Sequence, residues 1–225
     1  MKVLGIDTST ESLGIAIAED GKLLIGCDKI FGLRHSQDLI PTIKELLKSV
    51  SLTIDNIDGF AVAIGPGSFT GLRVGVTTAK ALAIVKNKPV VGVPTLDVIA
   101  HNAYYYPGTI CPIIDAKKGM LYAALYERKA KGLVRKSKYL LLTVEELLKK
   151  INKHTLFIGN GIIFYGKIIE KIKKEKAVLA PKRLWLPRSE NVAMLGWEEL
   201  KKGKTDNSFD IIPLYLHSRE CNIGK

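Results

Sequence analysis

Short apolar segments separated by turn residues open the chain. Residues 2–8 (KVLGIDT), 12–18 (SLGIAIA) and 22–28 (KLLIGCD) have the length and apolar content of strands. The sequences "ST" and "EDG" between them suit tight connections. The pattern predicts an antiparallel meander of three strands.

The rest of the first half adds helices and strands to this meander. Apolar residues recur at helical spacing over residues 36–50 (SQDLIPTIKELLKSV), which predicts an amphipathic helix. A strand at 59–64, a helix from about Thr70 to Val85, a strand at 89–93 and a helix from about Thr95 follow. The predicted order is β-β-β-α-β-α-β-α.

The same order returns in the second half of the chain. "TICPIID", "MLYAALYE" and "GLVRKSKYLLL" are typical of strands, and "TVEELLKKI", "TLFIGNG", "FYGKIIEKIKK", "AVLAP" and "SENVAMLGWEELKKG" continue the alternation of helices and strands. A repeat of about 105 residues with one element order indicates a duplicated α/β fold. We predict two lobes, residues 1–104 and 105–225.

The composition is that of a globular protein, with 47% hydrophobic and 25% charged residues in 225. No uninterrupted apolar run reaches the roughly 20 residues that a membrane helix needs. The start, "MKVLGIDTST", lacks the basic, apolar and cleavage regions of a signal peptide. We therefore expect a cytoplasmic protein without a membrane partner.

Cysteine and histidine are too scattered to indicate a metal or disulfide site. Cys27, Cys111 and Cys221 form no CxxC motif, so neither a disulfide framework nor a zinc ribbon is predicted. The four histidines form no HxxxH or HExxH pair. A G-x-S-x-G nucleophile motif is also lacking, so the sequence gives no indication that the chain is itself catalytic.

Positive charge is concentrated in the second half of the chain. Residues 1–104 hold 10 Lys/Arg and 10 Asp/Glu, whereas residues 105–225 hold 24 and 12. Such an excess favours contact with polyanions such as RNA. The alternative is a lysine-rich surface of a protein from a hot environment.

Two pairs of neighbouring lysines are the candidate RNA contacts. One pair is Lys117 and Lys118, and the other is Lys173 and Lys174. Lys117 and Lys118 follow an acidic residue at a turn between strands, where a solvated edge is the favoured interpretation.

The sequence "GIDTST" places Asp7, Thr8 and Ser9 where the first strand turns into the second. In two-lobed phosphotransferases of the actin and Hsp70 kind, an acidic residue and hydroxyls at this place face the phosphates and metal of a nucleotide. The alternative is that these side chains satisfy amides of the turn. Both interpretations stay open at this point.

The glycine-rich sequence "GPGSFTGLRVG" links a predicted strand to a predicted helix. It is not a Walker A loop, because no Gly-Lys-Ser/Thr follows, and no acidic residue ends the next strand as a dinucleotide site requires. Amides at a helix N-terminus still attract anions. Gly67, Ser68 and Thr70 are therefore candidate nucleotide-binding residues.

Small residues line one face of the helix after this loop. Gly71, Gly75 and Ala79 are spaced four apart, which lets another backbone approach closely. The face could pack on the sheet of its own lobe or against another subunit, and we weigh the two equally.

Together, "GIDTST", "HSQDLIPTIKELL", "GPGSFTGLRVGVTTAKALA", "GVPTLDVIA", "IDAKKGMLYAALY" and "PLYL" resemble the bacterial TsaB family, also called YeaZ. The long glycine motif is highly specific, and the others follow in the order of the family. The resemblance implies a duplicated, two-lobed actin/Hsp70-like fold of the ASKHA, RNase H-like kind. It also implies a place in tRNA threonylcarbamoyladenosine biosynthesis.

The resemblance further implies a required accessory subunit that is not itself the enzyme. Its partners would be the catalytic paralogue TsaD and the ATPase TsaE, which transfer threonylcarbamoyl to N6 of the adenosine 3′ of the anticodon in tRNAs reading ANN codons. The paralogue binds metal with an HxxxH pair on the helix matching 36–50. Here the pair is His35 and Leu39, which favours a non-catalytic role without a metal.

In the family, the helices matching 36–50 and 70–85 contact the catalytic subunit, and the same surface can form a homodimer. We therefore expect Leu39, Ile43 and Leu46 to be partly exposed in the lone subunit and covered on association. The interface residues would include Gly71, Gly75 and Ala79. Leucine at Gly75 is expected to block association without unfolding the lobe.

The alternative function is an independent nucleotide-binding ATPase or kinase of the actin/Hsp70 superfamily. The missing phosphate lysine and histidine pair favour the accessory subunit instead. We expect no cofactor on the lone chain, with ATP or ADP at the subunit interface as an open alternative. The tail "HSRECNIGK" is assigned no role.

Overall fold

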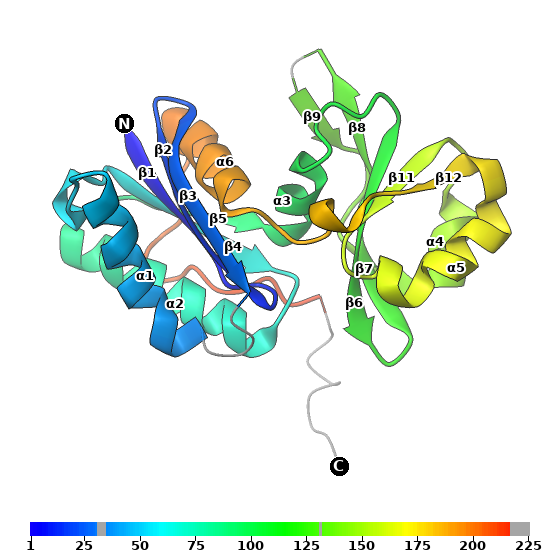
Figure 1. Ribbon diagram of the computed structural model, residues 1–225, viewed down its shortest axis with the longest axis horizontal. Helices are drawn as coiled ribbons and strands as arrows, with labels where there is room; N and C mark the ends of the chain where they lie inside the picture. Colours follow the sequence, from blue (N-terminus) through cyan, green and yellow to red (C-terminus); the bar gives the residue numbers. More distant parts are fainter. Residues whose placement is uncertain (31–34, 131, 217–225) are drawn as a thin grey trace. The chain divides into compact units, whose positions relative to one another are not determined.

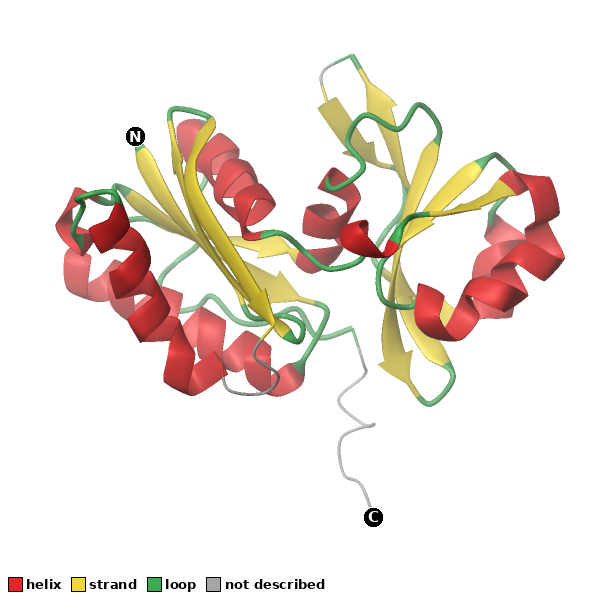
Figure 2. Cartoon of the chain, viewed as in Figure 1, coloured by secondary structure: helices red, strands yellow, loops and turns green. Residues whose placement is uncertain are grey.

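The computed structural model describes residues 1–30, 35–130 and 132–216. These residues form two compact units. The first comprises Met1–Val98 and Pro187–Leu214, and the second comprises Ile99–Leu186 and the described residues from Tyr215. Each unit is an α/β layer structure with its own sheet (Figures 1 and 2).

A five-stranded sheet of order β3-β2-β1-β4-β5 forms the centre of the first unit. Its first three strands are antiparallel neighbours, which confirms the predicted meander, and β4 and β5 run parallel to β1. The strands are β1 Lys2–Asp7, β2 Ser12–Glu19, β3 Lys22–Ile30, β4 Gly59–Gly65 and β5 Val90–Pro94.

Helices cover both faces of this sheet (Figure 1). On one face, α1 and α2 share a core with apolar side chains of β1, β2 and β4, among them Leu4, Ile6 and Leu13. On the other face, α6 packs on small residues of the same strands. The helical segments are α1 His35–Ser49, η1 Ile54–Asn56, α2 Phe69–Lys86 and α6 Ser189–Lys201, and α3 Thr95–His101 begins in the first unit and ends in the second.

The place of α6 differs from the predicted division at residue 104. Although α6 is close to the end of the chain, it belongs to the first unit. A Cβ at Gly5 of β1 would lie 2.8 Å from Cα of Ala193, and one at Gly196 would collide with the Cβ of Ala61. The absence of side chains at these glycines lets the helix approach the sheet closely, which element order alone does not reveal.

The second unit repeats the topology of the first. Its central path, β10-β7-β6-β11-β12, has the same antiparallel and parallel pairs in the same places. This confirms the duplicated α/β fold. The strands are β6 Thr109–Lys117, β7 Met120–Ala123, β8 Tyr126–Lys129, β9 Gly132–Arg135, β10 Leu140–Thr143, β11 Thr155–Ile158 and β12 Ala177–Leu179.

Two longer helices and two short ones complete the second unit. The α4 helix begins at a capping box, in which the Thr143 hydroxyl accepts from the Glu146 amide and the Glu146 carboxylate accepts from the Thr143 amide. The helical segments are α4 Val144–Lys150, α5 Ile162–Lys173, η2 Lys174–Lys176 and η3 Lys182–Leu184. Among the helices of the described ranges, none combines the length and apolarity needed to cross a membrane.

Candidate functional site

The candidate site lies where two neighbouring parallel strands of the first unit end. Strand β1 ends at Asp7, and β4 ends at Gly65 before the glycine loop and α2. Because parallel β1 and β4 are paired, the turn after β1 and the loop after β4 meet at one edge of the sheet. Gly65 has a φ of 106°, a conformation that a residue with a side chain rarely adopts.

Hydrogen bonds join the turn and the loop directly. The Ser68 amide donates to the carbonyl of Ser9 at 2.7 Å, and the Thr8 hydroxyl donates to the carbonyl of Gly71 at 2.7 Å. Ser68 also caps α2 by accepting from the Gly71 amide at 3.2 Å. A Cβ at Gly67 would collide with the Ser9 carbonyl, so this glycine permits the close approach of the two segments.

Asp7 is fully enclosed at this junction. Its Oδ1 accepts from both the amide and the hydroxyl of Ser9 at 2.8 Å, while its Oδ2 is buried and has no partner within the part of the chain that the structure describes. Burial raises the pKa of the Asp7 carboxyl to about 6, against the opposing effect of the Ser9 hydrogen bonds. The negative charge of Asp28 adds to this increase in pKa.

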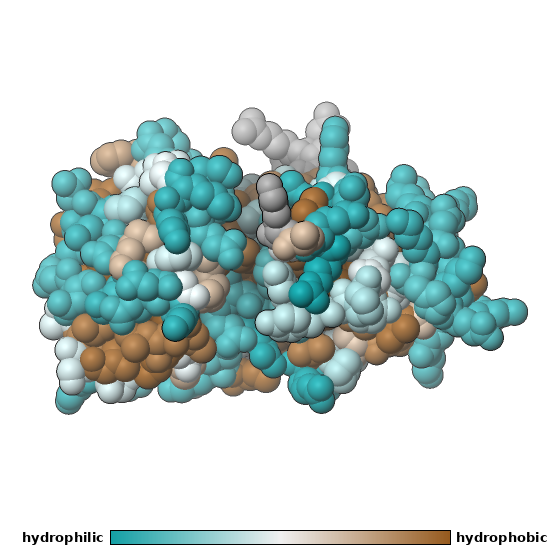
Figure 3. Space-filling model, turned by 90° about the horizontal axis from the view of Figure 1, so that it is seen from above, coloured by the Kyte–Doolittle hydropathy of each residue, from teal (hydrophilic) through white to brown (hydrophobic). Residues whose placement is uncertain are grey.

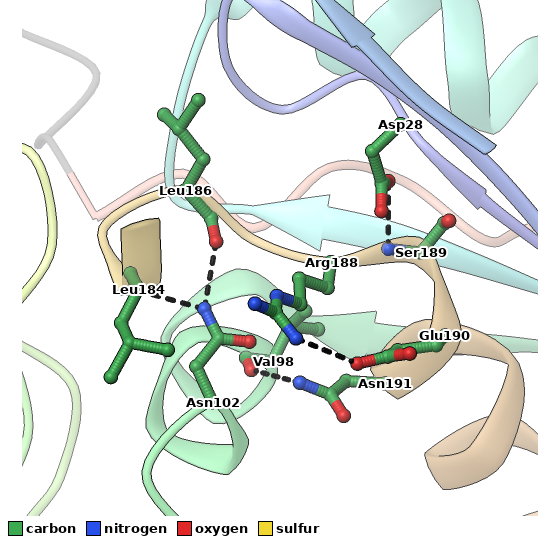
Figure 4. A network of polar contacts seen from close by, with 9 residues as sticks. All are labelled: Asp28, Val98, Asn102, Leu184, Leu186, Arg188, Ser189, Glu190 and Asn191. Atoms are coloured by element: carbon green, nitrogen blue, oxygen red, sulfur yellow. Dashed lines mark hydrogen bonds and ion pairs between the residues drawn. The ribbon is translucent and has the colours of Figure 1, made fainter. Parts of the chain in front are cut away.

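The register of the three-stranded meander places Asp28 near Asp7. Asp7 pairs with Gly14, and Gly14 pairs with Asp28, so the two acids flank a residue without a side chain. Oδ1 of Asp28 accepts from the Ser189 amide at 3.0 Å, at the first residue of α6 (Figure 4). Burial raises the pKa of Asp28 as well, and the Ser189 amide opposes that increase. The sequence analysis missed Asp28, because strand register is needed to place it.

His35 has a structural role beside this turn. Its Nε2 donates to the Thr10 carbonyl at 2.7 Å, and its buried Nδ1 has no hydrogen-bond partner among the described residues. Leu39, one helical turn later, is 1% exposed and belongs to the core. Over the described ranges of the chain, no three His, Cys, Asp or Glu side chains are grouped so that they could hold a metal ion.

The expected exposure of the α1 interface residues is wrong. Leu39, Ile43 and Leu46 are all buried. They pack with β1, β2 and β4 in the core of their own unit, because the most apolar stripe of an amphipathic helix is the stripe that its own sheet covers. Whether neighbouring residues of α1 contact a partner stays a prediction.

The small face of α2 packs within its own unit, which confirms one of the two alternatives. Gly71, Gly75 and Ala79 are buried. A Cβ at Gly71 would collide with the Thr8 carbonyl, and one at Gly75 would collide with the Thr8 hydroxyl. This contact with the β1–β2 turn argues against the expectation that leucine at Gly75 leaves the lobe folded, which stays a prediction.

The predicted nucleotide-binding residues lie at the turn after β1 and the loop before α2, but they differ in exposure. Asp7, Thr8 and Ser9 are buried and take part in the hydrogen bonds of the turn, whereas Thr70 is exposed. This arrangement supports the interpretation that the turn satisfies its own polar groups. Nucleotide binding stays a prediction.

The candidate lysines are all in the second unit. The ammonium of Lys117 pairs with Asp115 at 2.7 Å, and that of Lys173 donates to the Ile151 carbonyl at 2.7 Å. Lys118 and Lys174 are exposed. An RNA contact by either pair stays a prediction.

An apolar pocket beside α1 was not predicted. It has a volume of about 730 Å³ and is lined mainly by hydrophobic side chains of α1, residues 51–54 and α2, including Ile40, Leu52 and Leu82. On α2, Val85 is 77% exposed and Ile84 is also exposed. Sequence periodicity indicates which helix face is apolar, but it does not distinguish the buried centre of that face from its exposed margin.

Comparison with known proteins adds to this geometry. The family model for TsaD, tRNA N6-adenosine threonylcarbamoyltransferase, matches residues 29–225. The tRNA threonylcarbamoyladenosine biosynthesis protein TsaB of Bacillus subtilis (strain 168) is 30% identical, covering 98% of this chain and 96% of that protein. TsaB of Escherichia coli (strain K12) is 27% identical, covering 97% and 95%.

Solved structures show the same fold. YeaZ from Pseudomonas aeruginosa superposes with a TM-score of 0.84 at 24% identity, covering 96% of this chain and 99% of that one. The activator of 2-hydroxyisocaproyl-CoA dehydratase from Clostridium difficile superposes with a TM-score of 0.52 at 11% identity, covering 90% and 97%. At these identities the likeness establishes the actin/Hsp70-like fold alone.

Proposed function

Since the chain belongs to the TsaB family of tRNA threonylcarbamoyladenosine biosynthesis proteins, we propose that it is the non-catalytic partner subunit of the transferring complex. Its part in this tRNA modification follows from the family. The proposal concerns its role: it supports a catalytic paralogue, TsaD, and an ATPase, TsaE. These transfer threonylcarbamoyl to N6 of the adenosine 3′ of the anticodon in tRNAs reading ANN codons.

The replacement of a ligand by a core residue carries this proposal. Where the resemblance leads us to expect the second histidine of a metal-binding pair, the chain has Leu39, a hydrocarbon that is 1% exposed. The first histidine, His35, has its Nε2 on the Thr10 carbonyl and stabilises the turn instead. At these two positions the helix therefore stabilises the fold and does not bind a metal.

The polar groups of the turn and loop point to the same role. Transfer of an acyl group to an amine requires donors directed at the developing oxyanion. The Thr8 and Ser9 hydroxyls donate to Gly71 and Asp7, and the Ser68 amide donates to Ser9. These donors stabilise the junction of two loops, so an independent ATPase or kinase is not favoured.

The exposed margin of α1 and α2 is the proposed partner surface. It comprises Ile40 of α1, which lines the apolar pocket, and the exposed Ile84 and Val85 of α2, and it replaces the buried residues first expected there. Large apolar side chains of this kind become covered in protein interfaces. We place the complex in the cytoplasm. The same surface is proposed to form a homodimer. The lone chain is proposed to bind no cofactor, and the alternative is that ATP or ADP binds at the subunit interface.

Assembly with the catalytic paralogue tests this surface. Ile40→Asp and Val85→Asp each place a charge on the margin and should weaken association at least tenfold, since burying an unpaired charge costs several kcal/mol. Ile163→Asp, at an exposed apolar position of α5 in the second unit, is the matched control and should associate normally. The dissociation constant is measured by titration calorimetry.

Because these residues are exposed, the variants should fold like the wild type. Normal association of both margin variants would exclude this surface as the interface. If the α5 control variant weakened association equally, the interface would have to include the second unit.

A further inference from the structure

The second unit carries a surface of aromatic and basic side chains outside the site described above. It comprises Tyr104 and Tyr105, next to α3, and the β8–β9 hairpin with Arg128 and Arg135. In Figure 1 this hairpin lies at the top of the second unit, and Figure 3, seen from above, shows mostly hydrophilic side chains over that unit. None of these residues belongs to the candidate lysine pairs.

Arg128 contacts two tyrosine rings at once. Its Cζ lies 5.4 Å from the ring centroid of Tyr104 and 5.3 Å from that of Tyr105. The two rings meet edge to face, with centroids 5.1 Å apart. The ring of His101 stacks on the ring of Tyr104, with centroids 6.0 Å apart. This ordered cluster holds Tyr105 in a defined place although its side chain is 79% exposed.

The hairpin register brings a second arginine to the same face. Arg128 pairs with Leu133, and Arg135 lies two residues further along β9, so both arginines are on one side of the ribbon. Arg135 covers the ring of Tyr139 at 3.8 Å. Among the described residues, no carboxylate forms an ion pair with Arg128 or Arg135.

The charge around this face is strongly positive. Residues 126–139 contain six Lys/Arg and a single acid, Glu127. Glu127 is on the opposite side of the ribbon, where it pairs with Lys129 and Lys153. A pocket of about 190 Å³ at the base of the hairpin is lined by Lys136, Lys150 and Lys153, among others. Both sides of the hairpin therefore present cations.

We infer that this surface binds RNA by stacking an unpaired base on Tyr105, with the arginines and lysines of the hairpin contacting phosphates. Proteins recognise RNA loops by stacking splayed bases on aromatic rings and guanidinium planes, and basic groups contact the backbone. An exposed tyrosine held by a cationic neighbour provides both features. The identification of the RNA as tRNA rests on the proposed function.

The surface meets these requirements better than the two lysine pairs do. Lys117 is paired with Asp115, and Lys173 donates to a carbonyl of its own unit. Phe164 is the aromatic ring near Lys117, with the ammonium 5.6 Å from its centroid. It is exposed on α5, which makes it a matched control for the loss of an exposed aromatic side chain.

The test measures the affinity of full-length variants for unmodified tRNA by fluorescence anisotropy at several salt concentrations. Tyr105→Ala should weaken binding about tenfold without changing the salt dependence, because stacking is lost and no charge is removed. Tyr105→Phe should bind like the wild type. Arg128→Gln should weaken binding and lower the slope of log affinity against log salt by about 1. Phe164→Ala should have no effect.

A fully paired RNA duplex distinguishes base stacking from general attraction of a polyanion. It offers no splayed base, so Tyr105→Ala should bind it as the wild type does. Unchanged tRNA affinity in Tyr105→Ala, or equal weakening for tRNA and duplex, would overturn the inference.

Assembly is measured on the same variants, so that this inference and the proposed function can fail separately. A Tyr105→Ala chain that assembles, supports modification and binds tRNA normally contradicts only the inference. A wild-type chain that does not assemble with the paralogue contradicts the proposed function. The RNA surface is then tested on the chain alone, where a loss of affinity in Tyr105→Ala still supports it.

Discussion

Asp7 is a buried carboxylic acid, one oxygen of which has no partner over residues 1–30, 35–130 and 132–216, and its burial affects stability. Its pKa is about 6 in the folded chain, against an ordinary value of 3.8. The folded state therefore binds this proton more tightly than the unfolded state does. Its stabilising contribution is complete below about pH 4 and is lost as the pH rises through about 6. The total difference is about 3 kcal/mol.

Replacing Asp7 by asparagine should remove this pH dependence. Asparagine keeps an oxygen that accepts from Ser9 but does not ionise. The free energy of unfolding of Asp7→Asn, relative to that of the wild type, should increase by about 3 kcal/mol between pH 4 and pH 8. Urea unfolding at several pH values provides the measurement.

Asp20→Asn is the control, with an expected change of the opposite sign. Asp20 is exposed and pairs with the N-terminal ammonium at 2.7 Å, which lowers its pKa. Its replacement should lower the relative stability as the pH rises. A profile of Asp7→Asn that runs parallel to the wild type would show that burial does not shift this carboxyl.

The sequence predicted part of this site. One of the two interpretations of "GIDTST" was a turn whose acid and hydroxyls satisfy amides, and Asp7 does accept from the Ser9 amide, while the Ser9 hydroxyl donates to Asp7. Asp28 lies beside Asp7 only because Gly14 stands between them in the register of three strands. Register is set by pairing across the sheet, and no local signal in the sequence specifies it.

At the level of the element, the small face of α2 is a packing surface for the β1–β2 turn. Alanine at Gly75 has the higher helix propensity, by up to about 1 kcal/mol. Its Cβ would nevertheless collide with the Thr8 hydroxyl, which donates to the Gly71 carbonyl. We expect Gly75→Ala to lower the free energy of unfolding by about 1–3 kcal/mol.

Thr77→Ala, at an exposed position of the same helix, is the matched control. It should leave stability the same or raise it slightly, because nothing is displaced. Both values come from denaturant unfolding at neutral pH. Gly75→Ala with the stability of the wild type or above would show that the turn accommodates the added methyl group.

Elements were predicted well where hydrophobic periodicity is strong, as for α1 and the first three strands. The segment at 132–142 was predicted as one strand, but the structure has β9 and β10 with a break between them. The Lys136 amide donates to the Leu125 carbonyl, and the Ser137 hydroxyl accepts from the Leu125 amide. These bonds hold the segment against the β7–β8 junction, so a tertiary contact interrupts a run with strand propensity.

At the level of the whole molecule, element order predicted the duplication but not the division of the chain. The order β-β-β-α-β-α recurs in the second unit as β6, β7, β10, α4, β11 and α5, with the β8–β9 hairpin inserted between β7 and β10. The last helix, α6, returns to the first unit because Gly5 and Gly196 let helix and sheet approach closely. Glycine spacing within one segment does not reveal which distant segment it fits.

The position of the partner surface could not be predicted from the sequence either. Sequence periodicity indicated that α1 is amphipathic and that α2 has a face of small residues, whereas only the structure separates the buried Leu39 from exposed Ile40 and Val85. The margin of the apolar stripe, and not its centre, remains available for a second protein. The composition shows that the second half of the chain has an excess of positive charge, but it does not show where that charge lies. The β8–β9 register places Arg128 and Arg135 on one face.

Reconstituted tRNA modification tests the central claim most directly. The purified chain is given ATP, threonylcarbamoyl-adenylate and unmodified tRNA, alone and together with its catalytic paralogue and the ATPase, and modified adenosine is measured by mass spectrometry. We predict no modification by the chain alone, because its helix has Leu39 where the metal pair is expected and its donors are bonded within the fold. Adding the paralogue and the ATPase should restore the reaction. Modification by the chain alone, free of contaminating partner, would contradict the account and make Asp7, Ser68 and Thr70 the first residues to replace.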